Sequence, residues 1–320
     1  MTGPSFSDDL RREVDAFIES QPSQLDQKIM ASTVRDLREA FSLLRRVETQ
    51  KKVTIFGSAR TATHDPLYEQ TVRVARELAS RDWMVITGAG PGIMEAGMVG
   101  AGRERSIGVS IRLPFENAAN DIIAGDEKHA ELKYFFTRKF ALTKASQAFI
   151  CMPGGFGTLD ELFELLTLTQ TGKGQPVPIV LLDVPGDTYW KQADEFMTTQ
   201  MASRGLISPE DVSLYTVTND AVVAADEISR FYANFHSLRF VGNRLYIRLL
   251  HAATEAQIEK LNEEFSHLCV EGRIEVSEPH AAEIRDFDHV ALPRIMLLFD
   301  KRSFGGLRLL IDALNHLPSD

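Results

Sequence analysis

Cysteine is scarce in this chain: Cys151 and Cys269 are the only two among 320 residues, and they form no CxxC pair. Zinc sites and disulfide frameworks need thiols at closer spacing, so the sequence predicts neither and shows no metal-ligand cluster. An excess of basic residues is also missing, because the formal net charge is −10. Proteins that bind nucleic acid or membrane surfaces in general carry a basic face, so we expect neither partner.

Long apolar runs are absent as well. No run approaches the ~18 residues that a membrane span needs. The N-terminal stretch "MTGPSFSDDLRREV" is polar and acidic and has no signal-peptide core. We therefore expect a cytoplasmic protein. The hydrophobic fraction of 44% and charged fraction of 25% are ordinary for a globular protein.

Three regions are predicted along the chain: a helical arm over 1–51, a nucleotide-binding catalytic domain over 52–236, and a small α/β accessory domain over 237–320. In the arm, apolar residues recur at helical spacing, which predicts a helix that packs against the body or a partner subunit. They are Val34, Leu37, Ala40, Phe41 and Leu44. The tail contains two strand-then-helix patterns and no motif that indicates a chemical function.

The middle region alternates short apolar strands with helices. Strands are expected near 52–57, 83–87, 106–113, 147–152 and 177–183. Helices are expected over 66–81, 134–145, 158–170 and 188–203 and directly after the glycine turn in "WMVITGAGPGIMEAGMVGAG", with an irregular stretch at 115–131. Strands that are apolar on both faces and alternate with helices predict a parallel sheet covered on both sides. Ligands of such sheets bind at the carboxyl ends of the strands.

Glycine turns follow three of these strands, at Gly57, at Gly88 to Gly92 and at Gly154 to Gly157. The second turn is not a dinucleotide fingerprint, because Ile93 occupies the position of the third glycine. The next strand ends in Arg112-Leu113 where an acid would bind an NAD ribose. An arginine there could favour a 2′-phosphate, so an NADP-dependent enzyme is weakened as an alternative but stays open. A P-loop is absent.

The loop 153–158 has a more specific pattern. Gly154, Gly155 and Gly157 let backbone N–H groups approach a ligand, the following helix directs its positive end to the same place, and Thr158 adds a hydroxyl. This is a cradle for one phosphate, so the predicted ligand is a monophosphate.

Two acids, Asp160 and Glu161, are expected in the first turn of helix 158–170. We assign Asp160 to the helix dipole. Glu161 would be repelled by a bound phosphate, so we expect it to face a part of the ligand where positive charge appears. Arg138 shares an apolar stripe of helix 134–145 with Phe135 and Leu142, and such an arginine usually pairs with a carboxylate or phosphate. A purely structural ion pair is the alternative.

One phosphate site, one carboxylate and one arginine suit the cleavage of an N-glycosidic bond in a nucleoside monophosphate. The ribosyl group becomes oxocarbenium-like, so a carboxylate beside C1′ stabilises it and activates a water. Phosphate binding supplies remote binding energy. No cofactor is needed.

The motifs resemble the LOG ("Lonely Guy") family. "PGGFGTLDE" (153–161) matches the family's PGGxGTxxE signature, and "FFTRKFAL" (135–142) matches MxxRKxxM, with phenylalanine and leucine in place of the methionines. "FGSAR" (56–60) and "TGAGPGIMEA" (87–96) are similar to its first two turns, in the expected order. The resemblance covers about 52–235.

The resemblance implies a Rossmann-like doubly wound fold, a homodimer or higher homo-oligomer, and phosphoribohydrolase activity on AMP or cytokinin ribotides. It implies catalytic roles for Arg138 and Glu161. It also implies a nucleotide and phosphate pocket formed by Gly57, Ser58, Gly88, Gly90, Gly92, Glu95, Lys139, Gly154, Gly155, Gly157 and Thr158. The label "lysine decarboxylase", common among relatives, finds no support, since no lysine lies in a recognisable pyridoxal-phosphate setting.

A non-catalytic nucleotide sensor on the same fold, with the tail transmitting the signal, is the alternative function. Base preference depends on pocket walls, which we expect in the stretch 115–131 and in a partner subunit.

Overall fold

The computed structural model describes residues 5–112 and 119–317. Within these ranges seven parallel strands form the larger sheet: β1 (Lys51–Phe56), β2 (Trp83–Thr87), β3 (Ser106–Ile111), β4 (His129–Leu132), β5 (Ala148–Cys151), β6 (Ile179–Leu182) and β7 (Thr216–Thr218). Their order is β4-β3-β2-β1-β5-β6-β7. The strand order therefore reverses between β1 and β5, which makes this a doubly wound sheet with its switch point at that pair.

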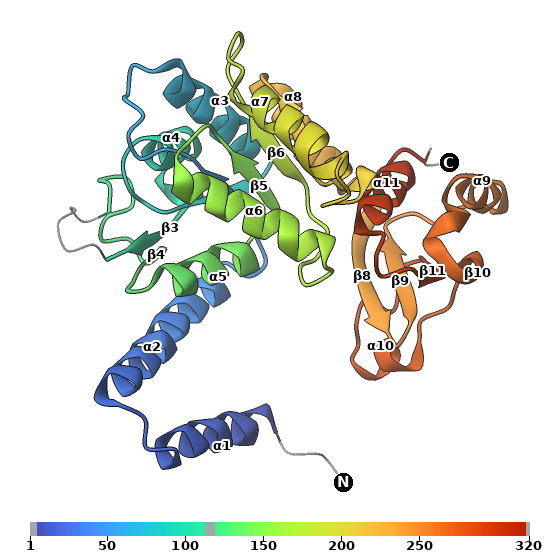
Figure 1. Ribbon diagram of the computed structural model, residues 1–320, viewed down its shortest axis with the longest axis horizontal. Coiled ribbons are helices and arrows are strands. Elements are labelled where there is room, and N and C mark those ends of the chain that lie inside the picture. Colours follow the sequence, from blue (N-terminus) through green and yellow to red (C-terminus); the bar gives the residue numbers. More distant parts are fainter. Residues whose placement is uncertain (1–4, 113–118, 318–320) are drawn as a thin grey trace.

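Helices cover both faces of this sheet, as predicted (Figure 1). On one face lie α3 (Pro66–Ser80), α4 (Ile93–Ala101) and α8 (Ala221–Arg230). On the other lie α5 (Phe135–Ala145), α6 (Phe156–Gln170) and α7 (Tyr189–Phe196), which continues as the π-helical turn η2 (Met197–Ala202). Adjacent β1 residues serve opposite faces: Ile55 packs with the first group and Phe56 with the second. Because both faces are buried, the strands carry apolar residues without alternation.

Five elements of this region were not predicted. Strand β4 begins inside the stretch 115–131, which was expected to be irregular, and ends one residue beyond it. Of that stretch 119–131 is described and 115–118 is not, and Leu113 also falls outside the described residues. The four-residue β4 and three-residue β7 are sheet edges, and strands this short leave little periodicity to read. Helix α8 and the short helices η1 (Arg103–Arg105) and η3 (Pro209–Leu214) were also unpredicted.

The N-terminal arm is helical, with α1 (Phe6–Glu19) and α2 (Gln24–Arg46). The predicted contact stripe of α2 is right in part: Ala40 is buried and Leu44 packs against the core, whereas Val34 is 49% exposed. The helix also buries Ser32, Asp36 and Leu43, which were not predicted. These residues face α5 and β4. Helix α1 buries no residue and extends away from the body (Figure 1).

The C-terminal segment forms a separate four-stranded antiparallel sheet in the order β10-β11-β9-β8. Its strands are β8 (Phe235–Val241), β9 (Arg244–Leu249), β10 (Cys269–Val276) and β11 (Arg294–Phe299), and its helices are α9 (Glu255–Phe265), η4 (Ser266–Leu268), α10 (Ala281–Arg285) and α11 (Phe304–Asn315). The two predicted strand–helix pairs are β9–α9 and β11–α11, whereas β8 and β10 were missed. None of the helices in the described ranges combines the length and hydropathy needed to cross a lipid bilayer.

Candidate functional site

The three glycine turns meet at the switch point of the larger sheet. Gly57 follows β1, Gly88 follows β2, and Gly154 comes after β5. The backbone N–H of Ile93 donates to the carbonyl of Ser58 at 3.0 Å, which ties the second turn to the first. Gly92 has φ 67°, and a β-carbon there would lie 2.5 Å from that carbonyl oxygen. Only glycine allows this approach of the two backbones.

A cavity of about 650 Å³ opens between these turns, a size suited to a nucleotide-sized ligand. Nine predicted site residues line it: Gly57, Ser58, Gly88, Arg138, Gly154, Gly155, Gly157, Thr158 and Glu161. The structure therefore gathers both predicted catalytic residues and the predicted phosphate loop around one cavity.

Four predicted residues do not line this cavity: Gly90, Gly92, Glu95 and Lys139. Gly90 and Gly92 belong to the turn that follows β2 but do not line the cavity. In this turn the Gly90 carbonyl accepts a hydrogen bond from the Asn120 side chain at 3.2 Å. Glu95 lies on α4. Burial raises the pKa of Tyr68, and the negative charge of Glu95 adds to that effect.

Helix α6 begins at Phe156, two residues earlier than predicted, with Gly155 as its N-cap and no side-chain cap. The N–H groups of its first turn have no carbonyl one turn earlier to bind, so they are free for a ligand. β-Carbons added to Gly155 or Gly157 would meet nothing within 4 Å, which shows the open side of the loop. The Tyr189 hydroxyl donates to the Gly154 carbonyl at 2.7 Å and fixes the loop from behind.

The earlier helix start corrects the prediction that Asp160 and Glu161 occupy the first turn, since that turn holds no acid. Asp160 is one turn too far from the helix end to interact strongly with the dipole. It pairs with Lys139 on α5 at 2.6 Å, and Lys139 also contacts Glu164 at 2.6 Å. Lys139 thus joins α5 to α6 outside the cavity.

Glu161 and Arg138 face each other inside the cavity. Nη2 of Arg138 lies 3.3 Å from Oε1 of Glu161, and the two side chains are 14% and 12% exposed. Burial raises the pKa of Glu161 to about 7, although the Arg138 charge opposes the shift. Nε of Arg138 is buried without a hydrogen-bond partner among the described residues. A carboxyl group that titrates near neutrality beside a fixed cation is suited to proton transfer.

Two residues at or next to this cavity were not predicted from the sequence. Arg60 lines the cavity next to the first turn, and its backbone N–H donates to Oγ of Ser58 at 3.1 Å. It makes no ion pair within the described part of the chain. A cation two residues after the Gly57-Ser58 turn was the available signal. Tyr189 lies 35 residues from Gly154, and nothing in the sequence connects them.

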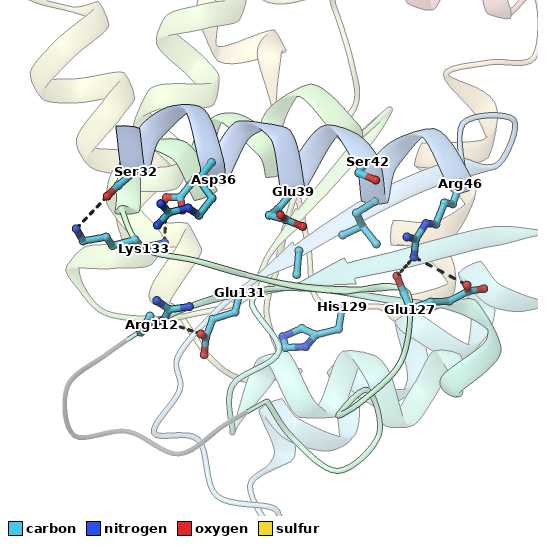
Figure 2. Close-up of a pocket in the computed structure, with 13 residues that line it drawn as sticks. Ser32, Asp36, Glu39, Ser42, Arg46, Arg112, Glu127, His129, Glu131 and Lys133 are labelled. Atoms are coloured by element: carbon cyan, nitrogen blue, oxygen red, sulfur yellow. Dashed lines mark hydrogen bonds and ion pairs between the residues drawn. The ribbon is translucent and has the colours of Figure 1, made fainter. Parts of the chain in front are cut away.

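A separate cavity of about 340 Å³ lies between α2 and β4 (Figure 2). Arg112, considered above as a possible 2′-phosphate ligand, lines this cavity and pairs with Glu131 at 2.7 Å. It does not line the switch-point cavity, so the structure adds no support to the NADP alternative.

Comparison with known proteins places the chain in a family. A family model described as "Possible lysine decarboxylase" matches residues 92–228. A probable cytokinin riboside 5′-monophosphate phosphoribohydrolase of Arabidopsis thaliana is 30% identical over 140 residues, which are 42% of this chain and 68% of that protein. The cytokinin riboside 5′-monophosphate phosphoribohydrolase of Mycobacterium tuberculosis is 30% identical over 133 residues, 39% of this chain and 67% of that protein.

Among solved structures, the molybdenum cofactor carrier protein of Chlamydomonas reinhardtii is 21% identical and has a TM-score of 0.41, with 57% of this chain and 97% of that chain covered. A likeness this distant carries no functional argument. The sequence relatives, by contrast, match over two thirds of their own length, and the chain belongs to the LOG family.

Proposed function

We propose that this protein hydrolyses the N-glycosidic bond of purine nucleoside 5′-monophosphates, AMP or cytokinin-type, to the free base and ribose 5-phosphate. The observation that carries the proposal is the buried Arg138–Glu161 pair at 3.3 Å, in the same cavity as the glycine loop. The names of the relatives support the reaction class.

In this reaction the 5′-phosphate binds the N–H groups at the start of α6, in the loop Gly154 to Thr158. Arg60 supplies the positive charge that a neutral backbone cradle lacks. Ser58 and the turn containing Gly88 border the ribose and base. Gly90, Gly92 and Glu95 contribute through the shape of that turn, and Lys139 through the α5–α6 contact.

Glu161 acts at C1′. The C1′–N bond breaks and its electron pair leaves with the base, while the Glu161 carboxylate stabilises the positive charge on the sugar. A water then forms the new bond to C1′, giving one proton to Glu161, from which it passes to the base. Arg138 opposes the effect of burial on Glu161 and so keeps more of it ionised.

The test is a product assay on AMP, other nucleoside monophosphates and a prenylated AMP, with the products separated by chromatography. We expect free base from the wild type and a loss of about 10²–10⁴-fold in Glu161→Gln, the range for a positioned acid or base. Asp160→Asn, at the neighbouring but exposed position, is the matched control and should keep its rate. Equal rates in wild type and Glu161→Gln would refute the mechanism.

A non-catalytic nucleotide sensor is the second candidate. In its favour, α6 and β8 line a common cavity of about 810 Å³, so the C-terminal sheet adjoins the helix that carries Glu161. Tight binding of AMP without release of base would support this function over hydrolysis.

We further propose that the chain forms a homo-oligomer in which α1 packs against α2 and α5 of a second copy. Phe6, Leu10 and Ile18 on one side of α1 are more than 60% exposed, and an isolated helix of 14 residues is marginal in water. Helix α1 has five acidic and two basic residues. Without Arg138, Lys139 and the buried Asp36, whose partners lie within this chain, α2 and α5 have six basic and two acidic residues.

Sedimentation velocity tests this assembly. Leu10→Asp with Ile18→Asp should shift the protein toward monomer. Arg11→Gln, a charge change on the same exposed helix, should not. A wild-type monomer at high concentration would contradict the proposal.

A further inference from the structure

Asp36 of α2 is a buried carboxylate that serves a different helix. It is 5% exposed, and its Oδ2 accepts three hydrogen bonds from the segment 133–137. The donors are the backbone N–H of Lys133 at 2.9 Å, the backbone N–H of Tyr134 at 3.1 Å and the hydroxyl of Thr137 at 2.7 Å. Figure 2 shows Asp36 and Lys133 meeting at the end of the cavity between α2 and β4.

These donors surround the N-terminus of α5. Its N-cap residue, Tyr134, makes no side-chain cap hydrogen bond. A carboxylate contributed from about 100 residues earlier in the chain therefore anchors the two residues that lead into α5 and the third residue of the helix. Its negative charge also complements the positive end of the helix.

The turn that Asp36 anchors leads directly into Arg138. Thr137 is fully buried and immediately precedes Arg138, so a shift of this turn moves the guanidinium relative to Glu161. We propose that Asp36 is a positioning residue, which fixes the first turn of α5 and through it holds Arg138 against Glu161. The proposal rests on the catalytic role proposed above for this pair. Asp36 lies outside residues 92–228, the range of the family model.

If the contact of Asp36 with the segment 133–137 only stabilised the fold, its loss would have different consequences. Its loss would lower stability but leave the Arg138–Glu161 distance unchanged in the molecules that remain folded. A positioning role predicts that the environment of Glu161 changes in the folded protein. Arg138 and Lys139 lower the pKa of Glu161 against the effect of burial, whereas Asp160 raises it, so withdrawal of Arg138 removes the larger of the two opposing charges.

The experiment compares the full-length wild type with Asp36→Asn, which keeps the shape of the side chain but loses its charge. The pKa of Glu161 is measured from its carboxyl carbon by NMR, with the signal assigned by its absence in Glu161→Gln. We expect a higher pKa in Asp36→Asn, because Arg138 no longer offsets burial. Hydrogen exchange should also quicken over 133–139 while β1 and β5 keep their protection.

Glu39→Gln is the matched control, one turn along α2 on an exposed site where Glu39 pairs with Arg38. It should change neither readout. Thr137→Val removes one of the three donors and should give a smaller change in the same direction, whereas Thr137→Ser should restore wild-type values. These milder variants keep the test valid if Asp36→Asn folds poorly.

With AMP as substrate, kcat/KM of Asp36→Asn should fall by about 10²-fold, the effect of a misplacement of about 1 Å in a catalytic group. An unchanged Glu161 pKa in folded Asp36→Asn would overturn the proposal, as would unchanged exchange over 133–139. Absence of turnover in the wild type would instead refute the proposed hydrolase, because the pKa and exchange readouts do not depend on activity.

Discussion

Oε1 of Glu161 lies 3.3 Å from Nη2 of Arg138, and the loop 154–158 borders the same cavity. The Glu161 carboxylate and the phosphate cradle therefore lie in the same cavity but at different places in it. Glu161 is in the second turn of α6, while the free N–H groups are at its start. A ribose phosphate between them would have its phosphate on the N–H groups and C1′ toward the acid.

The rate of the reaction should depend on the ionisation of Glu161. Its pKa is raised to about 7 by burial, and the reaction needs the carboxylate, so kcat/KM should rise with pH and level off above about pH 8. The measurement is kcat/KM for AMP from about pH 5 to about pH 9, where the phosphate itself titrates near pH 6. Glu161→Gln should lose the limb near pH 7, and a profile already flat at pH 5 would contradict this role.

Glu161 should also make stability depend on pH. Its folded-state pKa of about 7 lies above the ordinary value of 4.5, so its stabilising contribution is complete below about pH 4.5 and is lost as pH rises through about 7. Glutamine resembles the protonated acid, so Glu161→Gln should unfold with a free energy about 1–3 kcal/mol higher than the wild type near pH 8. Urea titrations at pH 8 and near pH 4.5 measure this difference. Equal stabilities of the wild type and Glu161→Gln at both pH values would show that burial does not raise the pKa of Glu161.

Two glycines of the phosphate loop should respond differently to alanine. A β-carbon on Gly154 would lie 2.3 Å from Oγ1 of Thr158 and 3.1 Å from the backbone nitrogen of Ser58, so Gly154→Ala should cost about 1–3 kcal/mol and raise KM for AMP. A β-carbon on Gly157 meets nothing within 4 Å, so Gly157→Ala should keep or slightly increase stability. Thermal unfolding of the Gly154→Ala and Gly157→Ala variants measures the two changes in stability. Equal losses would mean that the turns are not packed as described.

Lys139 should matter for structure more than for chemistry. It is paired with Asp160 and Glu164 and does not line the cavity. We expect Lys139→Met to lower the melting temperature while changing kcat/KM less than tenfold, and Arg138→Met to lower kcat/KM by more than about 10²-fold. If Lys139→Met lost as much activity as Arg138→Met, Lys139 would belong to the substrate site.

The sequence predicted the sheet and the position of the site for identifiable physical reasons. Strands such as β5 are apolar on both faces, and their glycine turns come at the carboxyl ends, which meet at the switch point. Residues close to these turns in sequence, such as Ser58 and Thr158, therefore line one cavity, as the sequence led us to expect.

Features that depend on distant pairing were missed. Asp36 interrupts the apolar pattern of α2 because it binds the segment 133–137 at the start of α5. The predicted stripe therefore included the exposed Val34 and left out the buried Asp36. Tyr189 reaches Gly154 only after folding. The start of α6 at Phe156 was missed because glycine favours a loop on propensity alone, and this error placed Asp160 and Glu161 in the wrong turn.

The most direct test of the account is the fate of water oxygen when the protein acts on AMP in ¹⁸O-enriched water. Attack at C1′ predicts adenine and ribose 5-phosphate in equal amounts, with one ¹⁸O in the newly formed sugar hydroxyl and none in the phosphate. Mass spectrometry of the sugar phosphate, taken before the anomeric oxygen exchanges with solvent, reads this out. Adenosine with labelled inorganic phosphate would contradict the account, as would a wild-type protein that binds AMP and releases no adenine.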